Sequence, residues 1–405
     1  MTSTPLNRTG ISLFNLPYLV QNEIYANWDL MEIFHFSTLS KRTKSISKSI
    51  RKEPFLMHLS PFFKKYQIEL CTGRKDENEK ERIWRLHFVP FTGCERLYKG
   101  NFYYPVFLKN SCENFVFLVE HLKDVFEVKF GTLELCIGVE IDDVKMKPYV
   151  EWMNDFNWES GKVPALSVIA RDEPSLKFLL KNLKRDVDQM KIDTYIRKEN
   201  PASKSGGNPK CSTPVNFKVD VLTGNGEEWW ATETMKSMDA IRMDFYQSDL
   251  SNLDMNQFLR SWKEGASNER LKEIKLPLRE RVKWRTMLEG LDADLRDFRT
   301  ARKIFRFAKD NQLYQLHGGF DITRADGRIA TIGHELYNLI FENQPMEQYK
   351  IEECTRISRV WNLEQGDEEE EIEDVIVLEE ADGHVADWRK YQRKQGRRHI
   401  FMIVW

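Results

Sequence analysis

The apolar positions of residues 11–54 recur at helical spacing in three short segments. Pro17 suits the first position of the first helix, where its missing N–H removes no hydrogen bond. Asp29 is a good N-cap for a second helix, and Glu32, three residues later, predicts a capping box. The basic run at residues 39–52 carries two isoleucines four residues apart, which predicts the buried side of a third helix.

Three short helices cannot bury so many apolar side chains by themselves, because a small fold hides too little surface. We expect part of this apolar surface to contact either the rest of the chain or a partner protein. The residues concerned are Leu16, Val20, Ile24, Ile33 and Phe34. An ordinary helical cap on the following domain would produce the same pattern.

Beyond this segment, the pattern of apolar residues predicts a hairpin and then strands that alternate with helices. Residues 60–90 predict a hairpin with a long charged turn. Strands are then predicted at residues 133–137, 165–169, 190–196, 217–221, 240–244 and 271–276. Helices are predicted between them at residues 115–126, 148–156, 174–183 and 228–238, and from Asn252 or Asp254 to Trp262. Such strand–helix–strand linkage implies a parallel sheet, and the spacing is typical of an irregular leucine-rich-repeat-like α/β layer.

The remaining segments differ in composition. Residues 200–209 are crowded with proline, glycine and serine and predict a mobile loop. Residues 279–310 are dense in charge with spaced leucines and predict helix. The acidic block at 367–374 and the basic run at 389–398 predict a solvated tail that is partly disordered. The fold class is therefore α+β, with an N-terminal helical segment and a larger α/β domain.

Length and charge narrow the protein class. The chain has 405 residues, which leaves room for two or three domains. Its formal net charge is −2, so the charge balance gives no reason to expect a nucleic-acid partner. Residues 1–10 are polar and no apolar run could span a bilayer, so we expect no membrane contact. The six scattered cysteines predict free thiols in a reducing compartment, either cytosol or nucleus.

No catalytic motif stands out. A G-x-S-x-G nucleophile elbow is missing. His334-Glu335 opens like the helix of a zinc protease, but the second histidine is missing, so we expect a strand end. Trp229, Trp230 and Trp262 could form a binding platform, although tryptophans on amphipathic helices are more often core residues. The motifs therefore predict no catalytic residue, no metal and no cofactor, and a hydrolase or transferase with dispersed catalytic residues stays open as an alternative.

Several residues of the first segment occur in an order and spacing that match a known family. They are the run Leu16–Val20, then Ile24, Glu32-Ile33 and the run Leu39–Ser45. The segment resembles an F-box, in the form found in nematode proteins. The resemblance implies docking onto the small Skp-type adaptor of an SCF ubiquitin ligase. The adaptor contacts would be Leu16, Pro17, Val20, Ile24, Ile33 and Phe34.

The later strand–helix region has a family resemblance too. It rests on Glu228-Trp229-Trp230, Ile241, Leu250, Leu253, the run Asn256–Leu259, Trp262 and Leu271. The region resembles the nematode F-box-associated domain of the second type, over residues 217–332. Residues 320–332 resemble the hairpin that closes that domain, and Gly327 supplies the residue that tolerates positive φ in its turn.

Together the resemblances imply a non-catalytic substrate-recognition subunit of an SCF-type, cullin–RING ubiquitin ligase. Its partners would be the Skp-type adaptor with the cullin core, and a target protein that the sequence does not identify. The alternative is an interaction scaffold with an F-box-like helical cap and no ligase role. The predicted domains are an F-box at 10–58, an F-box-associated domain at 59–345 and a charged tail at 346–405.

Overall fold

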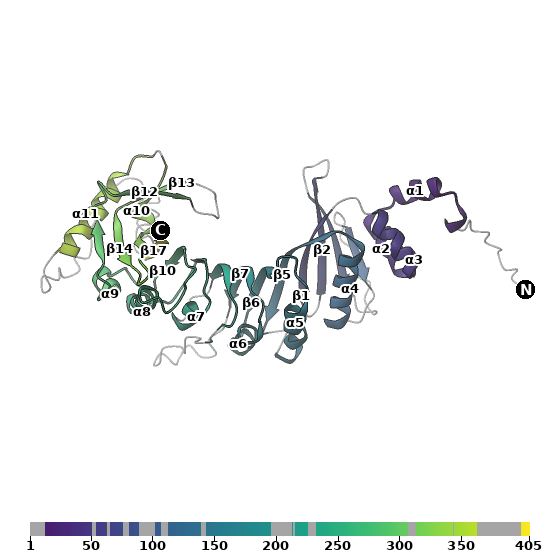
Figure 1. The fold of residues 1–405 in the computed structure, drawn as a ribbon, viewed down its shortest axis with the longest axis horizontal. Helices are drawn as coiled ribbons and strands as arrows, with labels where there is room; N and C mark the ends of the chain where they lie inside the picture. The colour runs from purple at the N-terminus through teal and green to yellow at the C-terminus, as the bar shows by residue number, and fades with distance from the viewer. Residues whose placement is uncertain are drawn as a thin grey trace, which may run out of the picture. The chain divides into compact units, whose positions relative to one another are not determined.

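The structure is a computed structural model of the chain. It describes residues 13–50, 54–62, 65–75, 81–88, 102–106, 112–138, 143–195, 213, 215–225, 232–306, 313–342, 344–362 and 398–405. The chain forms two compact units, Met1–Leu133 and Glu134–Trp405. The boundary falls inside strand β5 (Val128–Ile137). The predicted α+β class is confirmed, because N-terminal helices precede mixed α/β units (Figure 1).

The first unit opens with a helical segment. Its elements are η1 (Leu13–Asn15), α1 (Tyr18–Ala26), α2 (Leu30–Leu39) and α3 (Lys41–Ile50). Pro17 directly precedes α1, one position before its predicted place. The predicted capping box is confirmed, because the Glu32 N–H donates to Asp29 Oδ1 at 2.8 Å and the Asp29 N–H donates to Glu32 Oε2 at 2.8 Å.

A sheet follows in the first unit, with the strand order β5-β1-β2-β3-β4. The further elements are β1 (Phe55–Phe62), β2 (Lys65–Lys75), β3 (Glu81–Phe88), β4 (Phe102–Val106) and helix α4 (Cys112–Val125). Strands β2 and β3 pair antiparallel, which confirms the predicted hairpin. Helix α4 buries the predicted apolar face, including Phe115, Leu118 and Leu122.

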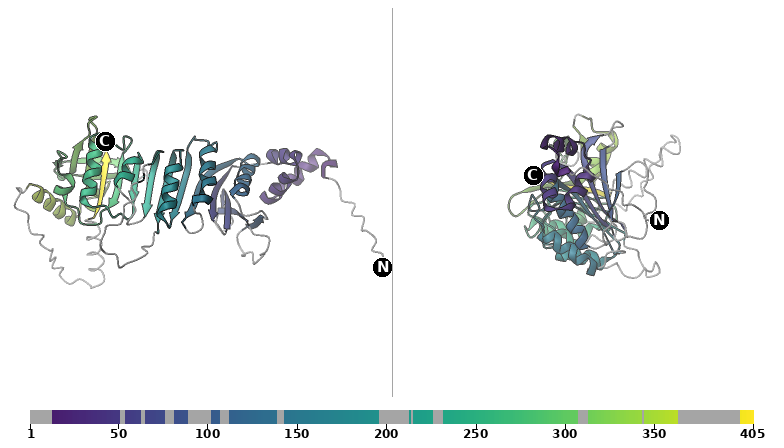
Figure 2. Two further views of the ribbon diagram at one scale, coloured as in Figure 1. Left: turned by 90° about the horizontal axis from the view of Figure 1, so that it is seen from below. Right: turned by 90° about the vertical axis from the view of Figure 1, so that its right-hand side faces the viewer.

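The second unit contains the predicted strand–helix alternation. Its strands β6 (Val163–Ala170), β7 (Val187–Thr194), β8 (Val219–Asn225), β9 (Arg242–Phe245) and β10 (Glu273–Pro277) pair in parallel, each with the next. Helix α5 (Asp143–Asp155) precedes β6, and helices α6 (Glu173–Asn182), α7 (Thr232–Ser237) and α8 (Asn252–Lys263) lie between the strands in the chain. All four lie on the same face of the sheet (Figures 1 and 2). Ser251, rather than Asn252 or Asp254, caps α8.

The strand registers explain which face forms the core. Leu166, Met190, Leu222, Met243 and Ile274 occupy one row across the five parallel strands, and all are buried. The next row is Ser167, Lys191, Thr223, Asp244 and Lys275, of which Lys191 is exposed and the others are partly exposed. Because side chains alternate across a strand, the helices cover the first row and leave the second on the open face.

The rest of the second unit extends this sheet in the order β10-β17-β15-β14-β11 and adds a smaller sheet, β12-β13-β16. These elements are α9 (Trp284–Leu288), β11 (Asp294–Arg296), β12 (Arg302–Arg306), β13 (Leu313–His317), β14 (Gly319–Thr323), β15 (Ile329–His334), α10 (Glu335–Asn338), β16 (Leu339–Phe341), α11 (Gln348–Asn362) and β17 (His399–Val404). Strands β14 and β15 pair antiparallel, so the hairpin predicted at residues 320–332 is confirmed.

The helix predicted over residues 279–310 is wrong for most of its length. Among the described residues of this range, up to Arg306, only α9 is helical, and strands β11 and β12 follow it. Gly290 and Asp292 adopt positive φ values of 68° and 50°, which a right-handed helix does not accommodate. Of the leucines that suggested a helix, Leu288 is the last residue of α9 and Leu291 lies in the turn after it, and they are 2% and 1% exposed.

Part of the predicted tail is also an integral part of the fold. Strand β17 pairs antiparallel with β10 on one side and β15 on the other. Its side chains Ile400, Phe401 and Met402 are almost fully buried. Residues 363–397, with the acidic block and most of the basic run, lie outside the described residues, as do residues 200–209. The domain limits at residues 58 and 345 stay predictions.

Candidate functional site

The first turn of α1 is the most exposed apolar segment of the N-terminal helices. Leu19 is 80% exposed, Tyr18 74% and Val20 42%, and Pro17 is exposed as well. We call Pro17, Tyr18, Leu19 and Val20 the exposed first turn. Consecutive apolar residues without cover are unusual on a protein surface and indicate a contact site.

The opposite end of α1 holds the helix in place. Tyr25 is the buried residue of this helix, and its ring lies 4.9 Å from Trp28 and 5.7 Å from Phe36. Trp28 also meets Phe36 edge-on at 4.8 Å. The Arg42 guanidinium lies 4.4 Å from the centre of the Phe14 ring. This aromatic cluster anchors α1 by its C-terminal turn, so the exposed first turn projects from a fixed support.

Two of the six predicted adaptor contacts, Ile33 and Phe34, are buried within the chain, and their contact with the adaptor stays a prediction. Ile33 is 8% exposed and Phe34 is 6% exposed. The Ile33 carbonyl accepts a hydrogen bond from Ser47 Oγ of α3 at 3.3 Å, and the Phe34 ring meets His121 of α4 edge-on at 5.9 Å. These residues were predicted to meet either the chain or a partner, and they meet the chain. Of the other four, Leu16 and Ile24 are half-buried, whereas Pro17 and Val20 are exposed.

Helix α4 holds α2 and α3 through polar contacts that we call the α4 clasp: Ser37, Lys44, Lys48, His121 and Asp124. The Ser37 hydroxyl lies 2.8 Å from His121 Nε2. Asp124 pairs with Lys44 at 2.6 Å and with Lys48. Hydrogen bonds from these two lysines lower the pKa of Asp124 to about 2. Burial, followed by the charge of Lys44, lowers the pKa of His121, so its ring is neutral at pH 7.

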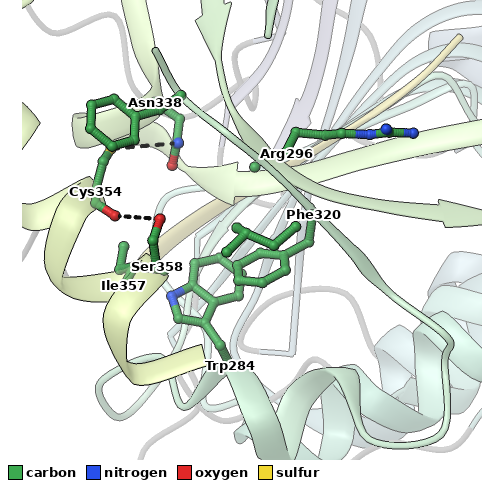
Figure 3. Close-up of a pocket in the computed structure, with 10 residues that line it drawn as sticks. Trp284, Arg296, Phe320, Asn338, Cys354, Ile357 and Ser358 are labelled. Carbon is green, nitrogen blue, oxygen red and sulfur yellow. Dashed lines mark hydrogen bonds between the residues drawn. The ribbon is translucent and has the colours of Figure 1, made fainter. Parts of the chain in front are cut away.

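One small pocket lies in the second unit, between α9, α11 and the end of the sheet (Figure 3). It contains about 260 Å³ of empty space, including the part open to solvent, and Trp284, Phe320 and Ile357 line it. Cys354 borders it, and burial raises the pKa of this thiol to about 12. A thiol with that pKa is protonated at neutral pH, so the pocket supplies no thiolate nucleophile.

The other residues singled out in the sequence have structural surroundings. Strand β15 ends at His334 and α10 begins at Glu335, which confirms the predicted strand end. Burial lowers the pKa of His334 to about 4, and its ring lies 5.0 Å from Trp284. Trp262 is 0% exposed and belongs to the core, while Trp229 and Trp230 lie outside the described residues.

Within the described ranges, no group of three or more His, Cys, Asp or Glu side chains is arranged to hold a metal ion. In the part of the chain that the structure describes, every helix is too short or too polar to span a bilayer.

Comparison with known proteins matches two separate parts of the chain to protein families. The F-box domain family matches residues 13–54, which include α1, α2 and α3. The F-box associated family matches residues 209–276, which include β8, β9 and most of β10. The chain therefore carries an F-box followed by an F-box-associated region, and both resemblances seen in the sequence are confirmed.

A curated relative matches most of the chain. The chain is 23% identical to the Skn-1 dependent zygotic transcript 15 protein of Caenorhabditis elegans over 349 residues, which cover 80% of this chain and 94% of the relative. No solved structure matches the chain. The hairpin at residues 320–332 lies beyond the matched region, so its family role stays a prediction.

Proposed function

We propose that this protein is the substrate-recognition subunit of an SCF-type ubiquitin ligase. The F-box binds the Skp-type adaptor, which links it to the cullin core, and the F-box-associated region holds a target protein. The chain performs no bond chemistry in this role. It brings a target lysine close to the charged conjugating enzyme, so that the transfer gains from proximity. The proposed setting is the cytosol or the nucleus.

The exposed first turn of α1 carries this proposal. Leu19 and Tyr18 have 80% and 74% of their surface in water, while the same helix is anchored at Tyr25. Burying apolar surface contributes roughly 25 cal/mol per Å² removed from water, so a partner that covers these side chains gains a large part of its affinity there. The proposed adaptor contacts are Leu16, Pro17, Tyr18, Leu19, Val20 and Ile24.

Leu39 is a further exposed apolar side chain of the N-terminal helices, outside the exposed first turn. It is 73% exposed at the C-terminal end of α2. Ile33 and Phe34 of the same helix support the proposal indirectly, because they fix α2 against α3 and α4. The rigid support lowers the entropy that binding would otherwise cost.

Co-purification with the adaptor tests the proposal. We expect the wild-type chain to retain a purified Skp-type adaptor and Leu19→Asp to lose it, because the variant places a charge in the apolar contact. Leu253→Asp is the matched control. Leu253 is 59% exposed on α8 in the F-box-associated region, and an acidic residue in the first turn of a helix does not oppose the helix dipole.

The outcomes separate the two readings of the F-box. Loss of adaptor in Leu19→Asp but not in Leu253→Asp supports the ligase role. If the folded wild-type chain and both variants all fail to retain adaptor, the ligase role is excluded and the protein is a scaffold with an F-box-like cap.

A further inference from the structure

Strand β12 is an open sheet edge in the second unit. The small sheet has the order β12-β13-β16, and among the described residues β12 hydrogen-bonds only to β13. The strand reads Arg302-Lys303-Ile304-Phe305-Arg306, and Figure 1 shows it beside β13. An edge strand offers backbone N–H and C=O groups to another extended chain.

The ladder to β13 fixes which backbone groups face outward. The Gly318 N–H donates to the Ala301 carbonyl at 3.0 Å, so this opposed pair is hydrogen-bonded. Bonded and non-bonded pairs alternate along an antiparallel ladder. Arg302 and Ile304 therefore point their N–H and C=O away from β13, and no described residue is recorded as a backbone partner for either.

The side chains of β12 divide into a half-buried inward face and an exposed outward face. Lys303 turns inward, where it lies 3.6 Å from Asp321 and 4.6 Å from the centre of the Trp405 ring. Arg302, Ile304 and Arg306 lie on the other face and are exposed, Ile304 to 56%. The outward face thus presents two guanidinium groups on either side of an apolar residue.

We propose that β12 binds an extended acidic segment of the target protein as an added strand. The segment would bond to the outward backbone groups of Arg302 and Ile304 and place a carboxylate beside Arg302. Opposite charges on neighbouring strands attract, and main-chain bonds supply the remaining affinity. That the partner is a ligase target rests on the proposed function.

The same charges argue against a second copy of this chain as the occupant. Two β12 strands paired edge to edge would bring Arg302 and Arg306 of one copy beside the arginines of the other. Like charges on neighbouring strands repel, so this pairing is disfavoured.

A labelled peptide tests the proposal on the full-length chain without adaptor. The probe is a fluorescent eight-residue peptide that alternates glutamate and valine, and fluorescence anisotropy reports binding. We expect this peptide to bind and to slow hydrogen exchange at the amides of Arg302 and Ile304. A peptide with lysine in place of glutamate should not bind, and neither should one with proline in place of the central valines, since proline donates no N–H.

Two variants of β12 and one control variant outside it localise the contact. Arg302→Glu should weaken binding roughly tenfold, because it replaces an attraction by a repulsion. Arg299→Glu makes the same charge change outside β12 and should leave binding unchanged. Ile304→Pro removes one outward N–H and no bond to β13, so it should abolish binding while circular dichroism shows an unchanged fold.

The proposal is overturned if the acidic peptide does not bind, or if Ile304→Pro binds it as well as the wild type. Equal weakening by Arg302→Glu and Arg299→Glu would also overturn it, because the attraction would then be general. A wild-type dimer that Ile304→Pro dissociates would assign the edge to a second copy. If the peptide binds only after serines replace the acidic residues 367–374, the occupant of the β12 edge is this acidic block of the same chain. All these measurements omit the adaptor, so they fail or succeed independently of adaptor binding.

Discussion

The Ser37 hydroxyl lies 2.8 Å from His121 Nε2, which joins α2 of the F-box to α4 across 84 residues of sequence. Phe34 meets the same imidazole edge-on. Lys44 and Lys48 of α3 reach Asp124 one helical turn further along α4. The F-box is therefore fixed to α4 on two of its helices, while the exposed first turn of α1 points to solvent.

The stability of the clasp should depend on pH through His121. Burial holds the pKa of this imidazole below its ordinary 6.5 in the folded chain. The unfolded chain therefore binds the proton first as pH falls, and the free energy of unfolding should decrease as the pH drops below 6.5. Urea denaturation at several pH values measures this. His121→Gln should flatten the decrease, and an identical pH profile in wild type and variant would exclude His121 as its source.

Below pH 4, the pH dependence of the free energy of unfolding should reflect the protonation of Asp124. Its pKa of about 2 is lower than the ordinary 3.8, so its ion pairs stabilise the folded chain above pH 3.8 and are lost as pH falls toward 2. Asp124 is 46% exposed, and solvent screening limits the contribution to about 0.5–1 kcal/mol at neutral pH. Asp124→Asn should lose this amount in low salt and less in high salt. Glu120→Gln, on the same helix, should have no such effect.

Interior and surface residues of the F-box should respond differently to truncation. Phe34→Ala removes a ring that is 6% exposed and should lower the free energy of unfolding by about 3 kcal/mol. Leu19→Ala removes a side chain that is 80% exposed and should change it by less than about 0.5 kcal/mol. Chemical denaturation of both variants checks this, and a similar loss from both would contradict the assignment of Leu19 to a free surface.

The last strand should be essential to the second unit. Phe401 is 0% exposed between β10 and β15, so Phe401→Ala should cost about 3–5 kcal/mol. Phe341→Ala is a matched control, because Phe341 is 47% exposed and should cost much less. Thermal unfolding compares the two. If both variants lower the stability equally and only slightly, residues 399–405 are part of a tail, as the sequence predicted, and not a central strand.

Features set by neighbouring residues could be predicted from the sequence. The capping box of Asp29 and Glu32 needs residues three apart, and the strand–helix alternation follows from local apolar spacing. Features set by distant pairing could not. The apolar run of β17 is short and follows a charged segment, and only its two neighbours in the sheet make it a central strand.

The candidate site in the N-terminal helices was also predictable only in part. The sequence correctly indicated an apolar excess in the first helices, but it could not say which side chains the chain would cover. Ile33 and Phe34 are covered by α3 and α4, and the relevant partners, Ser47 and His121, carry no apolar signal. Tyr18 and Leu19 are exposed because α1 packs on the other helices through Tyr25, and the sequence did not show which of these residues would be buried.

A titration of the purified chain with a purified Skp-type adaptor measures the proposed F-box–adaptor interaction itself. Isothermal calorimetry should show one adaptor bound per chain, with a negative heat-capacity change from apolar burial, and no heat of binding for Leu19→Asp. A wild-type chain that is folded by circular dichroism yet gives no heat of binding, or a Leu19→Asp variant that binds as tightly as wild type, would contradict the account.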